Sequence, residues 1–371
     1  MHSNRKAQLV ALGWDQWFVD RFDQVASSRS FAGSALLPAR VVADQGAGRV
    51  VHTGEAVHAA ALSRPLTRAS RHGTDPALPA VGDWVAIRVG GEQPLIEAVL
   101  ERRSAFRRKV AGPTSDEQVL AANVDITLVV AALDDGPNLR RIERALAVAW
   151  SSDTQPIVVL SKADLAAPDI AGSLRGEVEH VAAGAPVVAL SAVTGEGIER
   201  LPELLPAGRT AVLLGPSGVG KSTLLNRLVG DDVMRTGAVR SDGKGRHTTT
   251  HRQLVAMPWG GLLIDTPGLR ELQLWADVEE AGGVARLFAD VEQLASRCRF
   301  SDCGHTSEPG CAIRAAVARA ELTEGRLESY RKLTREAETI RRHVGQRHAR
   351  QAARGRRRRI AHLREEEQLG P

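Results

Sequence analysis

The 371-residue sequence predicts a multidomain protein with an N-terminal β-barrel, a central α/β domain and an α-helical C-terminal domain. Short alternating apolar runs between turn signals predict the barrel at residues 31–113. Strand-sized apolar runs that alternate with helical ones predict a parallel sheet at residues 114–275, and helical patterns dominate residues 276–345. Residues 1–30 are expected to be a helical docking extension, and residues 346–371 an arginine-rich tail.

Composition limits the class of protein. The sequence has no run of 18 or more apolar residues and does not begin with a secretory signal, which predicts a cytoplasmic protein without a membrane partner. Its formal net charge is +5, but residues 331–364 alone hold 13 Lys or Arg and two acidic residues. This basic segment predicts a polyanionic partner, although a solvated charged helix is the alternative.

The strands of the barrel are expected at a spacing of roughly ten residues, which is typical of an OB-fold. They are predicted at residues 39–42, 49–52, 56–59 and 84–87. The barrel is expected to end with the basic segment 102–109, which includes Phe106. This composition suits contacts with nucleic-acid phosphates, and an edge strand protected by charge explains it equally well.

The central domain is expected to follow a linker at residues 112–116 and to contain helices at residues 139–150 and 222–228. Its strands are predicted at residues 126–133, 156–160, 187–190, 210–214 and 262–264. Apolar strands separated by helices indicate a parallel sheet that is covered on both faces.

A phosphate loop is predicted between the strand at 210–214 and the helix that follows, because the segment matches G-x-x-x-x-G-K-[ST]. Its backbone N–H groups can surround phosphate oxygens, and Lys221 brings a positive charge to the β- and γ-phosphates, where it also acts in catalysis. Ser222 is the expected Mg²⁺ ligand. The loop comprises Gly215, Pro216, Ser217, Gly218, Val219, Gly220, Lys221, Ser222 and Thr223.

A γ-phosphate sensor is predicted downstream of this loop. Asp265 ends the next strand and can hold Mg²⁺ through water, while the N–H of Gly268 can meet the γ-phosphate. The polar, Gly-rich segment 243–251 has the composition of a switch loop, and Thr249 is expected to complete the Mg²⁺ shell.

Two motifs at strand ends predict which base is bound. The first is Ser161-Lys162-Ala163-Asp164, where Asp164 can accept hydrogen bonds from guanine and Lys162 can lay its stem on the ring. The second begins with Ser191 and Ala192, whose backbone N–H groups can meet the guanine O6. Together they favour GTP or GDP over adenine nucleotides.

The order of these motifs predicts a P-loop GTPase domain that is circularly permuted, because the base-reading motifs precede the phosphate loop. A permutation moves the termini and preserves the sheet. The sensor at residues 265–268 then runs directly into the C-terminal module, so hydrolysis is expected to change how that module holds its partner.

Three cysteines and one histidine open the C-terminal module and predict a structural zinc site. Cys298, Cys303, His305 and Cys311 supply four ligands, which leaves no position for water. Free thiols near a surface histidine are the alternative, and redox sensing is a secondary one.

The residue that orients the attacking water is less clear in the sequence. Many GTPases place a glutamine directly after the glycine of the sensor, but Leu269 occupies this position and cannot orient water. His247 in the switch loop is the candidate catalytic residue, with His251 as the second choice. The alternative is that both histidines are solvent-facing loop residues without a catalytic role. In that case the hydrolysis of GTP is intrinsically slow.

These motifs resemble the RsgA/YjeQ type of circularly permuted bacterial GTPase, which depends on the small ribosomal subunit. The resemblance covers residues 36–330 and includes SKAD, SAVTGEG, GPSGVGKST, HTTT, DTPG and the Cys3His spacing. It implies an OB-fold, a permuted GTPase domain and a zinc domain that bind ribosomal RNA late in subunit maturation, with subunit-stimulated hydrolysis of GTP controlling release. Ser161 stands where Asn or Thr is common, which implies a weaker brace on the phosphate loop. We expect a monomer.

Two other functions remain open at this point. A metabolic P-loop kinase or ATPase would have no need of guanine-reading motifs or an arginine-rich tail. An RNA-binding protein that holds GTP only as a structural ligand would account for Leu269.

Overall fold

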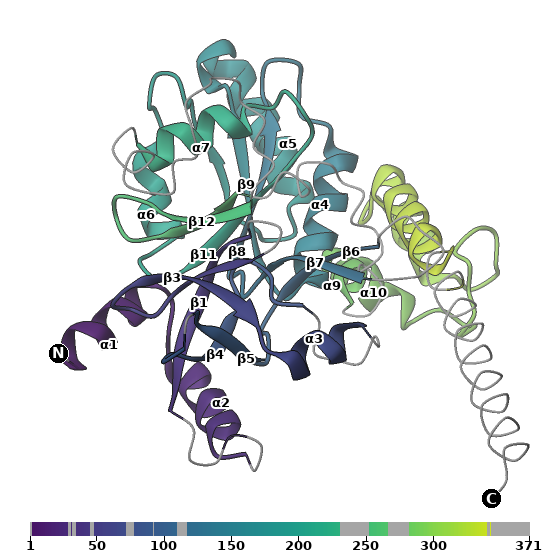
Figure 1. Cartoon of the computed structure of the whole chain (residues 1–371). Coiled ribbons are helices and arrows are strands. Elements are labelled where there is room, and N and C mark those ends of the chain that lie inside the picture. Colours follow the sequence, from purple (N-terminus) through teal and green to yellow (C-terminus); the bar gives the residue numbers. More distant parts are fainter. Residues whose placement is uncertain are drawn as a thin grey trace, which may run out of the picture.

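A barrel, a central sheet and a C-terminal helical module make up the computed structural model (Figure 1). It describes residues 2–28, 31, 35–44, 48–71, 78–91, 93–109, 117–230, 252–265, 282–339 and 342. Within these ranges no helix is both long and apolar enough to span a bilayer.

Five strands close the N-terminal barrel in the order β1-β2-β3-β5-β4, with β4 pairing back to β1. They are β1 (Leu36–Asp44), β2 (Arg49–His52), β3 (Val57–Leu62), β4 (Trp84–Arg88) and β5 (Leu95–Val99). Helix α3 (Arg64–Arg71) lies between β3 and β4 in the chain, and apolar residues such as Val41, Ile87 and Ile96 fill the interior. The predicted OB-type barrel is confirmed.

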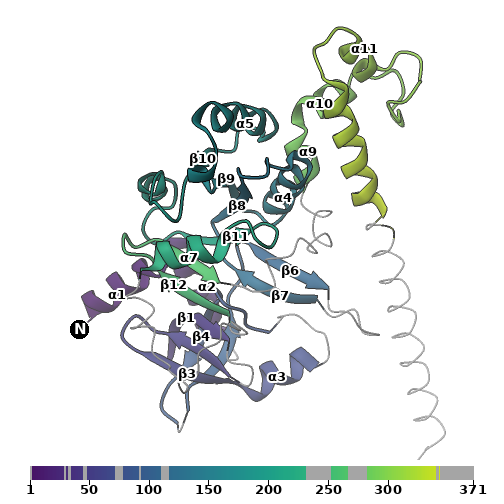
Figure 2. The same ribbon diagram turned by 90° about the horizontal axis from the view of Figure 1, so that it is seen from above.

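The basic segment 102–109 was expected to end the barrel, and this expectation is wrong. Strand β6 (Ala105–Lys109) instead pairs antiparallel with β7 (Glu117–Ala122) in a separate two-stranded sheet. Figure 2 shows this hairpin between the barrel and α4 (Leu139–Ser151). Phe106 is buried there in a core shared with the central domain. The linker predicted at 112–116 falls between the two paired strands and outside the described residues.

Two arginines of the same segment are used to hold the fold together. Arg102 donates to the fully buried carboxylate of Asp83, with an Nη2–Oδ2 distance of 2.7 Å. Arg103 donates to Asp15 of the N-terminal extension at 2.6 Å and lies over the ring of Trp17. Both guanidinium groups therefore have partners within the fold.

The central sheet has the strand order β10-β9-β8-β11-β13-β12, and all neighbours are parallel except β13 and β12. Its strands are β8 (Ile126–Ala132), β9 (Gln155–Ser161), β10 (Val187–Ala189), β11 (Thr210–Leu214), β12 (Arg252–Ala256) and β13 (Leu262–Asp265). Helices α4 and α5 (Pro168–Val181) cover one face, and α6 (Leu201–Leu204) and α7 (Lys221–Val229) cover the other. The three strands that precede β11 in the chain all lie on one side of it, as a permuted GTPase sheet requires.

The barrel and the central sheet form one continuous eleven-stranded sheet. The junction is an antiparallel pairing of β1 with β12, in which Ala43 faces Gln253 and Asp44 faces Arg252. The strand that follows the predicted switch loop is thus bonded directly to the barrel.

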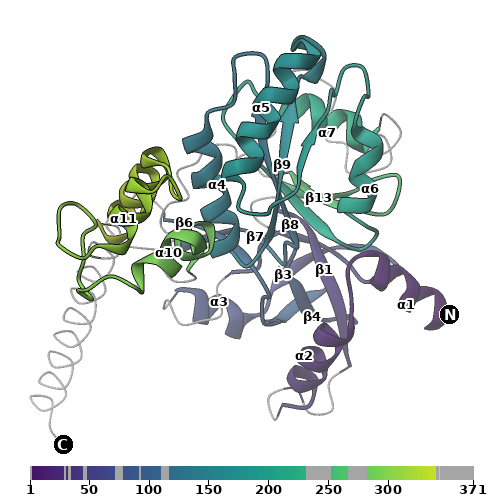
Figure 3. The ribbon, with the colours of Figure 1, turned by 180° about the vertical axis from the view of Figure 1, so that it is seen from behind.

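The C-terminal module contains α9 (Gly283–Leu287), α10 (Ala289–Ala295), α11 (Ala312–Ala318) and a helix over residues 324–339. It lies beside α4 (Figure 3), and its Phe288, Ile313 and Leu333 belong to the same apolar core as Leu146 of α4. The packing is close. A Cβ on Gly283 would lie 2.2 Å from the carbonyl oxygen of Ala147, so only glycine fits here.

A buried ion pair fixes the module to α4. Arg326 donates to Glu143 of α4 at 3.2 Å, and both side chains are less than one-tenth exposed. Arg326 also donates to the carbonyl of Leu287 at 2.7 Å and to Asp290 at 3.1 Å, while its guanidinium lies over the ring of Phe288. Burial raises the pKa of Glu143, and Ser329 and Arg326 oppose this shift.

The N-terminal extension is helical, as predicted, and docks on the barrel. It consists of α1 (His2–Ala11) and α2 (Gln16–Ala26), and the ring of Trp14 meets that of Trp84 on β4 with centroids 4.6 Å apart. Asp15 begins α2 by accepting hydrogen bonds from the backbone N–H groups of Trp17 and Phe18.

One buried guanidinium joins the extension, the barrel and the central sheet. Arg40 of β1 is 2% exposed and donates to the carbonyl of Leu12, to those of Gly82 and Asn123 at 3.3 Å, and to Thr210 Oγ1 at 2.8 Å. Loss of solvent lowers the pKa of Arg40 to about 10, although the charges of nearby aspartates oppose the shift. The guanidinium stays charged at neutral pH.

We expect Arg40→Met to lower the free energy of unfolding by about 3 kcal/mol, because three buried carbonyl oxygens lose their donor. Urea denaturation followed by tryptophan fluorescence measures this, since Trp14 and Trp84 lie beside the site. Arg319→Met is the control, because Arg319 pairs with Glu321 where both side chains are more than half exposed. Equal stability of the two variants would contradict the assignment.

Candidate functional site

The predicted nucleotide-binding residues gather at one edge of the central sheet. Strands β9, β10, β11 and β13 run in the same direction, so their carboxyl ends lie at the same edge. Ser161 and Asp265 end their strands, Gly215 directly follows β11, and Ser191 is the second residue after β10. The sheet therefore brings together predicted site residues that are up to about a hundred positions apart in the chain.

The phosphate loop lies between β11 and α7, and Lys221, Ser222 and Thr223 form the first turn of α7. The ammonium of Lys221 is buried and donates to the carbonyl of Gly215 at 2.7 Å and to that of Pro216. A Cβ on Gly215 would lie 2.4 Å from the carbonyl of Val130, and its φ of +155° also favours glycine. The loop thus surrounds the ammonium of Lys221, and this arrangement can present the ammonium to a phosphate.

Ser161 ties the base-reading motif to the phosphate loop. It is buried at the end of β9, and its hydroxyl donates to the carbonyl of Val219 at 2.6 Å. The resemblance implied a weaker brace on the phosphate loop, because Ser161 stands where Asn or Thr is common. The short distance shows that the serine hydroxyl makes the bracing bond.

The two base-reading loops contact each other. Lys162 has a left-handed backbone with φ of +59°, and the N–H of Ala163 donates to the carbonyl of Leu190 at 3.1 Å. Asp164 follows in an exposed 3-10 turn. In the second loop, Ser191 is buried and precedes Ala192. The Ser191 hydroxyl accepts hydrogen bonds from the backbone N–H groups of Val193 and Thr194.

A cavity of about 300 Å³ opens beside the phosphate loop, within the range of small-ligand pockets. Besides residues 215–219 and Lys162, it is lined by Asp134 and Asn138 of the loop that joins β8 to α4 and by Arg141 in the first turn of α4. Asp134 Oδ2 accepts from Lys162 Nζ at 2.6 Å. The sequence analysis missed these three residues, because no motif marks this loop and only its place between β8 and α4 could have indicated it.

Several predicted site residues lie outside the described part of the chain. They are His247, Thr249, His251, Gly268 and Leu269. Their assignments as switch, sensor or catalytic residues stay predictions from the sequence.

The predicted metal ligands lie together in the C-terminal module. The ligand atoms of Cys298, Cys303, His305 and Cys311 are all within 4.8 Å of one another. Cys298 Sγ lies 3.9 Å from Cys311 Sγ, and His305 Nδ1 lies 3.7 and 3.6 Å from these two sulfurs. Tetrahedral zinc bonds would separate such ligands by about 3.5 to 3.8 Å, whereas a disulfide needs about 2.05 Å. The cluster could hold a zinc ion.

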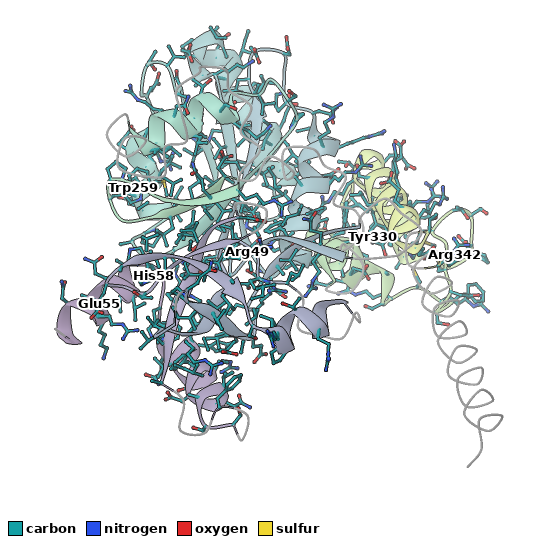
Figure 4. All side chains as sticks on the ribbon, in the orientation of Figure 1. Arg49, Glu55, His58, Trp259, Tyr330 and Arg342 are labelled. Carbon is teal, nitrogen blue, oxygen red and sulfur yellow. The ribbon has the colours of Figure 1, made fainter. Side chains whose placement is uncertain are left out.

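The surroundings shift the pKa values of three of the four ligands in different directions, and burial raises the pKa of Cys303 to about 11, which opposes a thiolate there. Burial opposes ionisation of Cys298, but hydrogen bonds from the backbone of Ala312 and Ile313 hold its pKa below the ordinary value, which suits a thiolate ligand. Burial lowers the pKa of His305, which suits a neutral imidazole. Figure 4 labels Tyr330 in the same module. Its hydroxyl donates to Glu292 at 3.0 Å.

Glu308 shapes the loop that carries His305. Its carboxylate accepts from the N–H groups of Gly304 at 3.0 Å, Thr306 at 2.7 Å and Ser307 at 3.0 Å. Hydrogen bonds from its own N–H and from Thr306 and Gly304 lower the pKa of Glu308 to about 2. The carboxylate is thus ionised at neutral pH and holds the ligand loop in place.

The chain is similar to a well-populated group of bacterial proteins. A family model described as "RsgA GTPase" matches residues 99–275, and one described as "ABC transporter" matches residues 200–365, which include the phosphate loop shared by many nucleotide-binding proteins. A relative from Opitutus terrae, "Small ribosomal subunit biogenesis GTPase RsgA", is 48% identical over 88% of this chain and 89% of its own length. A relative of the same name from Streptomyces coelicolor is 47% identical over 91% and 89%.

Solved structures agree on the fold. The crystal structure of YjeQ from Thermotoga maritima has a TM-score of 0.60 at 29% identity and covers 82% of this chain and 99% of its own. The structure of YloQ, a circularly permuted GTPase, has a TM-score of 0.59 at 22% identity, with 84% and 98% covered. The second likeness concerns the fold alone.

We expect Glu308→Gln to weaken zinc binding about tenfold, because a neutral amide offers a single acceptor oxygen to three N–H groups and brings a donor against them. Competition with a chromophoric chelator measures the zinc affinity. Glu321→Gln is the control, since Glu321 forms an exposed pair with Arg319. An unchanged affinity in Glu308→Gln would show that the carboxylate does not support the ligand loop.

Proposed function

Because the chain belongs to the RsgA GTPase family, we propose that it acts in the late maturation of the small ribosomal subunit as a GTPase. It hydrolyses GTP to GDP and phosphate in a manner stimulated by the subunit, and hydrolysis controls its release from ribosomal RNA. The relatives' printed names support the pathway, and the geometry of the sheet edge supports the chemistry.

The observation that carries the proposal is the 2.6 Å hydrogen bond from Ser161 to the carbonyl of Val219. It joins the motif that reads the base to the loop that holds the phosphates. A nucleotide that contacts both loops would therefore meet a single connected surface. A kinase or ATPase without guanine specificity would not need a hydrogen bond between these two loops.

The proposed role of each nucleotide-binding residue follows from its place. Asp164 accepts hydrogen bonds from guanine, Lys162 covers the ring, and the turn at Ser191 and Ala192 meets the guanine O6. Residues 215–220 surround the phosphates, and Lys221 neutralises charge that develops during hydrolysis. Thr249 and Gly268 are proposed partners of Mg²⁺ and the γ-phosphate from the sequence pattern alone.

Two metals fit the proposed function. Ser222 and Asp265 are the residues that would hold Mg²⁺ with GTP, and this ion would neutralise phosphate charge there. Cys298, Cys303, His305 and Cys311 would hold one structural Zn²⁺, whose chemistry is to fix the fold of the module.

Ribosomal RNA is the proposed partner of the basic surfaces. Residues 331–364 carry the basic excess of the sequence, and Arg64 and Arg68 are exposed basic residues of α3 in the barrel. Binding through phosphates would make the affinity strongly dependent on salt. We further propose a cytoplasmic, monomeric protein.

The packing of the C-terminal module modifies the proposed coupling. The sequence predicts that hydrolysis changes the pose of this module. The module shares a core with α4 and is bonded to it through Arg326 and Glu143, so a change of pose has to carry α4 with it. We therefore propose that the nucleotide acts on α4 and the module as one body.

Purified small ribosomal subunits should raise the GTP turnover of the chain at least about tenfold over its basal rate, because the subunit completes the catalytic arrangement. Phosphate release measures the effect, and large subunits serve as the control. Equal turnover with and without small subunits would contradict the proposed stimulation. Bound GTP that is never hydrolysed would favour the RNA-binding alternative, and displacement of bound GTP by ATP would point to a metabolic ATPase.

His247→Ala should lower the subunit-stimulated turnover by about a hundredfold and leave the affinity for GTP unchanged, because a neutral imidazole can orient or deprotonate the attacking water. The matched variant His251→Ala should retain most of the stimulated rate. If His251→Ala is the slower enzyme, the two histidines exchange roles, and full activity in both excludes a catalytic histidine in this loop.

A further inference from the structure

Lys162 is held at both ends, and its outer partner has no assigned role. The inner end is fixed because Ser161 is bonded to Val219 at 2.6 Å and the N–H of Ala163 donates to Leu190 at 3.1 Å. The outer end is fixed because the ammonium donates to Asp134 at 2.6 Å. The four-carbon stem therefore spans two anchored points.

Asp134 reaches this position through the register of the sheet. Strands β8 and β9 are parallel neighbours with Ala132 opposite Ser161, and the N–H of Leu133 donates to the carbonyl of Ser161 at 3.0 Å. Lys162 is consequently the first residue beyond the paired end of β9, and Asp134, after Leu133, is the second residue beyond that of β8. Their ion pair lines the same cavity as residues 215–219.

This ion pair adds little to the stability of the fold. The side chains of Lys162 and Asp134 are 30% and 23% exposed, and pairs near the surface contribute little because solvent screens them. Its greater effect is on the freedom of the lysine. An unanchored lysine samples many rotamers, whereas the anchored one presents its methylene groups in a single orientation before a ligand arrives.

We propose that Asp134 is a positioning residue for guanine, which orients the stem of Lys162 so that it covers one face of the base. This inference rests on the proposed function, because it assigns a role within the same nucleotide site. Asp134 also balances the charge of Lys162. The lysine then contributes to recognition of the base.

The effect should appear in binding and should be independent of the number of phosphates. Asp134→Asn should weaken GDP and GTP by the same factor, about five- to tenfold, because a lysine that must be ordered on binding costs affinity. The turnover number at saturating GTP should not change. A role through charge alone predicts the opposite trend, since loss of a negative charge near the phosphates would tighten GTP more than GDP.

The experiment measures the affinities of GDP and GTP by fluorescence of a labelled nucleotide on the full-length protein. Asp135→Asn is the matched control, because it removes the same charge from the adjacent position and no ion pair of Asp135 occurs among the described residues. Lys162→Met keeps an apolar stem without the ammonium. In the Lys162→Met background, Asp134→Asn should have no further effect on nucleotide affinity. With Lys162 present, Asp134→Glu should bind nucleotide more tightly than Asp134→Asn does.

The outcomes separate this inference from the proposed function. Absence of guanine-nucleotide binding by the wild-type chain would contradict the proposed function itself. Tight binding by the wild type with unchanged or tighter binding by Asp134→Asn would overturn the positioning role alone. Equal losses in Asp134→Asn and Asp135→Asn would assign the effect to the net charge of the loop and would likewise overturn it.

Discussion

The guanidinium of Arg40 is the point at which the N-terminal extension, the barrel and the central sheet meet. It donates to Leu12 of the extension, Gly82 of the barrel, Asn123 after the hairpin and Thr210 at the start of the strand that leads to the phosphate loop. A planar group with five donors can satisfy several carbonyls that belong to different segments. Because each of these acceptors lies at or near an end of its element, this one side chain helps to fix the relative placement of all of them.

A second arginine has the same role on the other side of the central sheet. Arg326 connects the helix at residues 324–339 to Glu143 on α4 and to the carbonyl of Leu287, over the face of Phe288. In both places a cation with several acceptors joins parts that are distant in sequence, while the apolar core continues beneath. The central sheet and the C-terminal module therefore share one apolar core, whereas the barrel has its own core and is joined to them through Arg40 and the pairing of β1 with β12.

The sequence predicted the central sheet well, because buried parallel strands such as residues 126–132 and 210–214 are continuous apolar runs with few alternatives. Prediction from the sequence failed where a residue lies in an environment that is unusual for its type. Arginines at positions 40, 102 and 103 normally indicate an exposed surface, and their partners Thr210, Asp83 and Asp15 are too distant in sequence to be recognised by spacing. Strand β12 was missed because its short sequence is only partly apolar and none of its residues is buried.

The candidate site shows the same division. The phosphate loop, the base-reading loops and the Cys3His cluster have spacings that chemistry imposes, so the residues could be identified and their proximity is confirmed. Asp134 carries no such mark. Its place beside Lys162 results from the register of β8 against β9, which only the assembled sheet determines.

The pairing of β1 with β12 has a consequence for any fragment of this protein. A central domain cut away from the barrel would leave the outer side of β12 as an open sheet edge, with N–H and C=O groups that had bonded to Ala43 and Asp44. Such edges recruit other strands and lead to aggregation. By covering the edge of β12, the barrel keeps the central sheet soluble, independently of any partner that the barrel binds. The barrel and the central sheet are therefore expected to be inherited, expressed and folded together.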